Sequence, residues 1–301
     1  MDGEGRGRER WGIAAAAASS LIGGLSLVAI RRVVGTTDPV LLAFFRYGIG
    51  ALCLLPLSLR GRERLPPPRA WPEIVLLGGL FFALFPILLN QALVDTTASR
   101  GALALSSLPL LTLVIAATAG AERLTGRKLA GILLACAGVA LALAGQGFGA
   151  QGLSTHGLST GHWRGDLTMV AAALIGALYN VLARPAIRRH GALGFTALAM
   201  AAGAVTLMLL VPFGGPLSAR LPQDGLGWGA VGFLGLVGGA LTFLLWSAGL
   251  ARTTPTRVAV TVALNPVSAM LVGAFWLGEP IGPALLGGLG AVTLGILVAS
   301  R

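Results

Sequence analysis

Residues 93–138 read LVDTTASRGALALSSLPLLTLVIAATAGAERLTGRKLAGILLACAG, and a related stretch, LARTTPTRVAVTVALNPVSAMLVGAFWLGEPIGPALLGGLGAVTLG, occupies residues 250–295, which is 157 positions later. Several equivalent positions along the two stretches carry the same residue. These pairs include Thr96 and Thr253, Arg100 and Arg257, Pro109 and Pro266, Glu122 and Glu279, and Gly138 and Gly295. Both copies are nearly continuous apolar sequence, so the duplicated unit is a bundle of membrane helices. Internal repeats in such bundles are typical of transporter folds.

The overall composition indicates that a bilayer surrounds this chain. Hydrophobic residues make up 55% of the sequence and charged residues 11%, and the mean hydropathy is +0.83. A water-soluble domain could not cover so much apolar surface. The formal net charge is +11, but the Lys and Arg residues form short clusters between apolar runs, which argues against nucleic acid as a partner.

Ten hydrophobic stretches are long enough to cross the hydrocarbon core as helices, because each spans about 20 residues. The sequence therefore predicts an all-α membrane protein. The expected spans are 11–30, 40–59, 72–93, 99–119, 128–146, 166–183, 194–213, 226–250, 255–277 and 281–300.

The basic residues predict the orientation of these spans. Most of the 22 Lys and Arg residues fall in the tail and in alternate loops that lie on one side, and short cytoplasmic loops retain Lys and Arg. Both termini are therefore expected in the cytoplasm. Five helices per copy force the second repeat to enter the membrane from the opposite side, so the repeats are inverted. The organisation comprises a tail (1–10), a first repeat (11–146), an external linker (147–164) and a second repeat (165–301).

Several segments resemble the EamA family of the drug/metabolite transporter superfamily. They are Trp246-Ser-Ala-Gly-Leu250, Thr253-Thr254-Pro-Thr-Arg257, Asn265-Pro266 with Leu277-Gly278-Glu279, Arg46-Tyr47 with Leu54-Leu55-Pro56, and Leu108-Pro109 with Ala121-Glu122. The resemblance covers residues 11–300. It implies a bacterial inner-membrane exporter of small metabolites, with amino acids as the leading substrate class. The alternatives within the superfamily are a nucleotide-sugar carrier and a drug exporter.

The acidic residues bear on energy coupling. All 11 lie in termini, in loops or at the ends of the predicted helices, whereas ion-coupled carriers commonly bury a carboxylate within the bundle. The first span also lacks the glutamate that small multidrug exporters carry there. This pattern favours movement of the solute down its gradient.

Arg46 is the one ionisable side chain within a predicted span. It either binds a substrate carboxylate, or extends to the interface and pairs with helix carbonyls. Pro109 and Pro266 occupy equivalent positions in two predicted spans, where each removes a backbone hydrogen bond. We expect this pair to act as hinges; the alternative is a static kink.

Other polar and aromatic residues within the spans are further candidates for substrate binding, because buried amides and hydroxyls need partners. They are Phe85, Asn90, Ser106, Ser107, Tyr179, Asn180, Trp246 and Asn265. Phe85 lies beside Pro86 with Phe81 and Phe82, where packing is the simpler interpretation. Trp246 fits an interfacial anchor equally well.

No catalytic set, metal site or cofactor is expected. A membrane-embedded enzyme would need a nucleophile or an acid–base pair at depth, and His156 and His162 in the linker have no carboxylate or thiol nearby. A purely structural scaffold would not require inverted copies. Small residues in the fifth and tenth spans, such as Gly131 and Gly295, suit close helix packing within one chain or between two, so we expect a monomer or weak homodimer.

Overall fold

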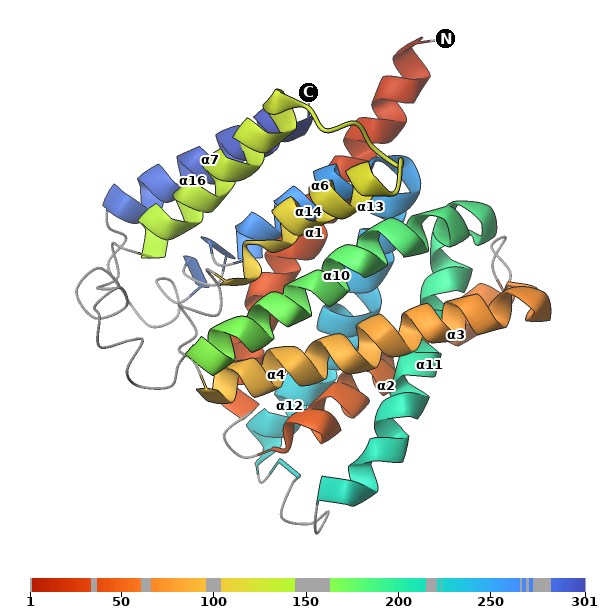
Figure 1. Cartoon of the computed structure of the whole chain (residues 1–301). Coiled ribbons are helices and arrows are strands. Elements are labelled where there is room, and N and C mark those ends of the chain that lie inside the picture. The colour runs from red at the N-terminus through yellow and green to blue at the C-terminus, as the bar shows by residue number, and fades with distance from the viewer. Residues whose placement is uncertain are drawn as a thin grey trace. The chain divides into compact units, whose positions relative to one another are not determined.

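The computed structural model describes residues 2–33, 37–60, 66–95, 104–143, 163–214, 221–222, 224–265, 267–268, 271–272 and 283–300. All regular structure in these ranges is helical (Figure 1). The α-helices are α1 (Asp2–Val33), α2 (Pro39–Arg60), α3 (Trp71–Gly79), α4 (Phe85–Asp95), α6 (Leu108–Thr118), α7 (Gly126–Leu143), α10 (Trp163–His190), α11 (Ala192–Leu210), α12 (Gly225–Gly235), α13 (Thr242–Arg252), α14 (Pro255–Val260) and α16 (Pro283–Ser300).

Shorter elements join or extend these helices. Two π-helical turns are η2 (Leu80–Leu84) and η6 (Leu236–Leu241), and the 3₁₀ turns are η1 (Pro68–Ala70), η4 (Val211–Gly214) and η7 (Thr261–Ala263). Five helical stretches of the described chain are long and apolar enough to cross a membrane: Pro39–Arg60, Pro68–Ala92, Trp163–His190, Ala192–Phe213 and Gly225–Arg252. The predicted all-helical membrane class is thereby confirmed at this level.

The chain forms two compact units, and each takes segments from both predicted repeats. Unit 1 comprises Met1–Ile87 and Leu182–Thr253, and unit 2 comprises Leu88–Val181 and Thr254–Arg301. The predicted repeats are therefore units of sequence, whereas each compact unit combines helices of both copies.

In unit 1, α2 packs against α11, and α1 packs against α13. The Ser19 hydroxyl of α1 donates to the Thr242 carbonyl at 2.8 Å, which satisfies a polar group that would otherwise be buried without a partner. The Asp38 carboxylate accepts from the amides of Val40 and Leu41 and caps the start of α2. These contacts fix the elements that carry the candidate site.

The two π-helical turns of unit 1 lie at equivalent places in the two repeats. Adding 157 to η2 takes Leu80 to Val237 and Leu84 to Leu241, and both targets lie in η6. Beside η2, Pro86 has no N–H to donate within the helix. In η6, the Thr242 hydroxyl donates to the Val237 carbonyl at 2.8 Å. Single π turns inside α-helices are frequent at functional sites.

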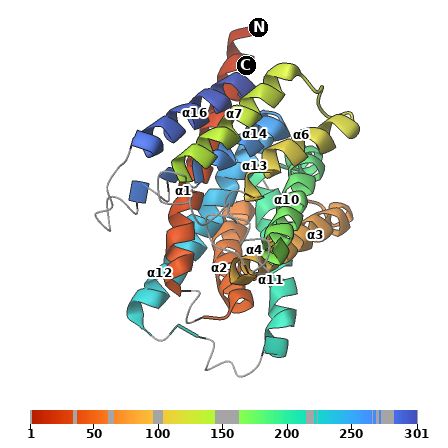
Figure 2. The same cartoon turned by 60° about the vertical axis from the view of Figure 1, so that its left-hand side comes forward.

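In unit 2, α7 and α16 run side by side and antiparallel (Figure 1 and Figure 2). A Cβ on Gly131 would lie 2.5 Å from the Ala299 amide nitrogen, and one on Gly138 would lie 2.7 Å from that of Val292. A Cβ on Gly295 would lie 2.6 Å from the Ala135 nitrogen. Only glycine permits this approach. The small residues of the fifth and tenth spans therefore pack within one chain, as one of the two predicted arrangements required.

The helices around the paired prolines are interrupted, also at equivalent places. The Ser107 amide donates to the Ala104 carbonyl, which closes a tight turn. The helix α6 begins only after this turn, at Leu108. The 3₁₀ turn η7 occupies the corresponding residues of the second copy, after α14. Pro109 is thus the second residue of a helix, where it costs no helical hydrogen bond. Pro109 therefore removes no hydrogen bond within α6, contrary to the expectation from the sequence, and its role as a hinge stays a prediction. Pro266 lies outside the described residues.

We expect the glycine contact between α7 and α16 to set the stability of unit 2. Gly295→Val should lower the melting temperature measured in detergent, because overpacking of this kind costs about 1–3 kcal/mol. Gly290→Val is the matched control, since a Cβ on Gly290 of the same helix meets nothing within 4 Å. Equal melting of both variants would contradict the close packing.

Candidate functional site

The Arg46 guanidinium lies against the π-helical turn η6 in unit 1. Its Nε and Nη2 groups both donate to the Gly238 carbonyl, at 3.2 and 2.7 Å. A π turn displaces the regular hydrogen-bond ladder, so a carbonyl in it becomes available to a side-chain donor. Arg46 therefore pairs with a helix carbonyl, which was one of the two predicted alternatives. A guanidinium carries five N–H groups, so further donors remain for a ligand.

Aromatic rings surround this arginine. Its Cζ atom lies 5.4 Å from the ring centroid of Tyr47 and 5.7 Å from that of Phe243, within cation–π range. Phe243 also contacts Phe81 and Phe82 edge to face, with centroids 5.6 and 5.0 Å apart. The ring of Tyr47 meets Phe82 at 5.3 Å. A guanidinium beside an apolar aromatic wall suits a ligand with a carboxylate and an apolar side chain.

Two other predicted site residues, Phe85 and Trp246, also lie in unit 1. Phe85 stacks on Phe81 with centroids 5.1 Å apart, at the edge of the aromatic cluster. Trp246 lies on α13 and is 7% exposed, whereas Trp11 and Trp228 are 50% and 45% exposed. An interfacial anchor would expose its ring to the lipid headgroups, so the burial of Trp246 argues against that alternative.

Sequence reasoning did not select Tyr47 or Phe243 as site residues. The duplication could have pointed to Phe243. This residue is the equivalent of Pro86, and Phe81, Phe82 and Phe85 are grouped around Pro86 in the sequence. In the second copy an aromatic ring replaces the proline and completes the cluster.

The remaining predicted binding residues lie in unit 2. Tyr179 and Asn180 on α10 are 0% and 1% exposed, and Asn90 on α4 is 8% exposed. The Ser107 hydroxyl donates to the Ala104 carbonyl at 2.7 Å, which uses it locally. The Cys136 thiol donates to the Ser106 carbonyl at 3.2 Å. Within unit 2 these residues lie on α4, on α10 and in the turn that precedes α6.

Asn265 has a different environment. Its side-chain oxygen is buried and accepts no hydrogen bond from any described residue, while its backbone carbonyl accepts from the Ser268 hydroxyl at 3.0 Å. It directly follows the interrupted helical turn at η7. An unsatisfied buried amide oxygen is costly and suits a donor from a ligand or water.

Glu122 was not selected as a site residue, although it belongs to the motif that carries the family resemblance. Its carboxylate accepts from the Thr256 amide at 2.9 Å, which caps the start of α14. Its second oxygen forms an ion pair with Lys128. The Glu122 side chain is 1% exposed, so this contact joins the α6–α7 connection to α14 within unit 2.

Apolar membrane-length helices, duplicated backbone irregularities and buried polar groups inside the helices define a multi-span transporter-type protein. The chain matches the EamA-like transporter family over residues 10–144 and 163–301, and it belongs to that family.

Named relatives agree with this class. The chain is 28% identical over 239 residues to the "Probable terminal-alkyne amino-acid exporter" of Streptantibioticus cattleyicolor, covering 79% of this chain and 76% of the relative. It is 28% identical to the "Uncharacterized transporter YyaM" of Bacillus subtilis strain 168, covering 93% and 90%. A solved crystal structure with 23% identity covers 96% of each chain with a TM-score of 0.77, which establishes the fold.

We predict that Glu122→Ala destabilises the protein by about 1–3 kcal/mol, because it leaves the buried Thr256 amide without its acceptor. Lys128→Ala should cost less, since the Lys128 side chain is 17% exposed and the cap survives. Thermal unfolding in detergent of the two variants measures the difference. A larger loss from Lys128→Ala would show that the ion pair, and not the cap, dominates.

Proposed function

We propose that this protein exports small metabolites, amino acids foremost, across the bacterial inner membrane by alternating access. The observation that carries the substrate class is Arg46, a guanidinium on α2 beside the aromatic wall of Tyr47 and Phe243. An amino acid offers the two matching features, a carboxylate and a side chain. The relative named as an amino-acid exporter supports the same class.

The Arg46–Gly238 contact suggests how binding is linked to movement. A substrate carboxylate that takes the guanidinium competes with the Gly238 carbonyl, because a charged acceptor forms the stronger hydrogen bond. The freed carbonyl lies in η6, where the helical ladder is already displaced. Substrate binding therefore changes the hydrogen bonding of the turn that joins α12 to α13.

Equivalent irregularities in both repeats support alternating access. The π turns η2 and η6 form one pair, and the tight turns at Ala104–Ser107 and η7 form a second. Inverted copies of one flexible unit provide two opposite-facing states of similar energy. In this proposal the bending points are these turns, and Pro109 marks the start of a rigid helix. We retain proline bending at Pro266 as an expectation.

Nucleotide-sugar and drug export are the alternatives within the superfamily. A diphosphate needs several cationic groups, and Arg46 is the one charged residue in the aromatic cluster. A lipophilic cation would instead be repelled by Arg46.

Proteoliposome uptake tests the proposal. Wild-type protein should exchange radiolabelled neutral amino acids without an imposed ion gradient. We expect Arg46→Gln to raise the KM by about tenfold or more, since a charge-assisted hydrogen bond is lost. Arg46→Lys should raise the KM less, because lysine keeps the positive charge but lacks the planar fork of the guanidinium. Arg60→Gln, at the exposed end of α2, is the control. An unchanged KM in Arg46→Gln would overturn the assignment of Arg46.

The proposed orientation places both termini in the cytoplasm. A reporter fused after Arg301 should be active only on the cytoplasmic side, and a single cysteine introduced at Gly157, with Cys53 and Cys136 replaced, should react with an impermeant reagent added outside. External activity of the Arg301 reporter would contradict the inverted-repeat arrangement, because it requires an odd number of spans.

A further inference from the structure

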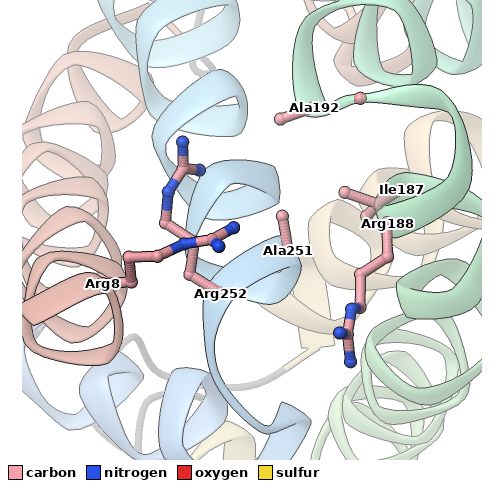
Figure 3. A pocket seen from close by; sticks show the side chains of 7 residues that line it. Arg8, Ile187, Arg188, Ala192, Ala251 and Arg252 are labelled. Carbon is pink, nitrogen blue, oxygen red and sulfur yellow. The ribbon is translucent and has the colours of Figure 1, made fainter. Parts of the chain in front are cut away.

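Unit 1 contains a basic pocket that the transport proposal does not use. It has a volume of about 260 Å³ and is lined by Arg8 of α1, Arg188 of α10, Arg252 of α13, and the α10–α11 connection at Gly191 and Ala192. Figure 3 shows Arg8 and Arg252 on one side of the pocket and Arg188 on the other. All three side chains are exposed. Among the side chains that the structure describes, the lining contains three cations and no acidic group.

The arginines differ in how they are held. Arg252 stacks on the Trp11 ring, with Cζ 4.4 Å from its centroid, and donates to the Ala248 carbonyl at 3.1 Å. Arg8 and Arg188 make no hydrogen bond or ion pair with any residue whose side chain the structure describes, a set that begins at Gly7 on α1. On α1, the Glu9 carboxylate next to Arg8 in the sequence accepts from the Thr253 hydroxyl at 3.4 Å. Three like charges thus line one cavity, and their mutual repulsion costs free energy that a bound anion would offset.

The backbone adds to the positive character. The 19-residue helix α11 begins at Ala192, and its N-cap, Gly191, provides no side-chain hydrogen bond. The positive end of the helix dipole at this terminus favours an anion.

The position of the pocket indicates the source of that anion. Three stretches with the length and apolar character of membrane spans end or begin at its lining, namely Trp163–His190, Ala192–Phe213 and Gly225–Arg252. The ends of such spans lie at the level of the lipid headgroups. Basic pockets between the ends of membrane helices suit anionic headgroups.

We infer that the pocket formed by Arg8, Arg188 and Arg252 binds a phosphate group, and that an anionic phospholipid headgroup supplies it. Arginine suits this ligand, because its planar fork binds two phosphate oxygens at once. The occupied pocket joins α1, α10 and α13 at one end of unit 1, so lipid binding would stabilise this unit.

The test uses the full chain in a neutral detergent. Short-chain phosphatidylglycerol, short-chain phosphatidylcholine and inorganic phosphate are titrated separately, and binding is followed by thermal stability and by tryptophan emission, to which Trp11 contributes. We expect saturable binding of phosphatidylglycerol and binding of phosphatidylcholine at least about tenfold weaker, because choline neutralises the headgroup. Arg8→Gln and Arg188→Gln should each weaken phosphatidylglycerol binding by about tenfold.

Arg189→Gln is the matched control, because Arg189 is exposed on the same turn of α10 and does not line the pocket. Arg252 is not replaced, since its loss would also remove the contact with Trp11. Inorganic phosphate that competes with phosphatidylglycerol, with the same sensitivity to Arg8→Gln and Arg188→Gln, would support the site with a soluble phosphate as its ligand. Equal phosphatidylglycerol binding by wild type, Arg8→Gln and Arg188→Gln would overturn the inference, as would the absence of binding by either anion.

Discussion

A bilayer offers no hydrogen-bond partner to a free backbone group, and this constraint explains why the helix interruptions carry specific side chains. A regular helix satisfies its own carbonyls, whereas a π or 3₁₀ turn leaves some of them without their usual donor. The Gly238 carbonyl accepts hydrogen bonds from the Arg46 guanidinium, and the Val237 carbonyl accepts one from the Thr242 hydroxyl. In unit 2, the Ser106 carbonyl receives the Cys136 thiol. Side chains that first appear to be binding residues therefore also complete the backbone of the helices.

The duplication determines where these interruptions occur, and it does so through local chemistry that differs between the copies. Pro86 prevents a regular ladder beside η2, while the Thr242 hydroxyl replaces a backbone donor beside η6. The antiparallel pairing of α7 and α16 has the same origin. Gly131 approaches the region of Gly295, and Gly138 approaches the Gly288 carbonyl. Gly288 and Gly295 are the equivalents of Gly131 and Gly138, so each glycine meets the equivalent of the other. A two-fold axis relates contacts in this way.

Hydropathy and length were sufficient to predict an all-helical membrane protein, because a continuous apolar stretch has few alternatives in lipid. The predicted start of the second span at residue 40 and the start of α2 at Pro39 differ by one residue. The small residues of the fifth and tenth spans predicted close packing, because only a missing side chain allows two backbones to approach. The 3₁₀-type turn before Pro109 was not predictable from hydropathy, since it changes the backbone without changing the polarity of the segment.

The candidate site was harder to predict for a physical reason. Sequence patterns identify a charged residue within a predicted span, such as Arg46, but its partners come from segments that are distant in the chain. Gly238 has no side chain and gives no signal of its own, and Phe243 resembles any other core aromatic residue until it is placed beside Arg46. Compact units that combine helices of both repeats produce such contacts systematically.

The two interpretations of Arg46 are compatible in energetic terms. A buried guanidinium needs an acceptor at every stage, because an unpaired charge in a low-dielectric interior is expensive. The Gly238 carbonyl is a neutral acceptor that satisfies part of its hydrogen-bonding capacity, and a carboxylate binds the same fork more strongly. A carbonyl in a displaced turn is therefore a suitable resting partner, since it holds the guanidinium in place and yields it to a stronger acceptor. Arg46 thus needs no acidic partner within the membrane before the substrate arrives.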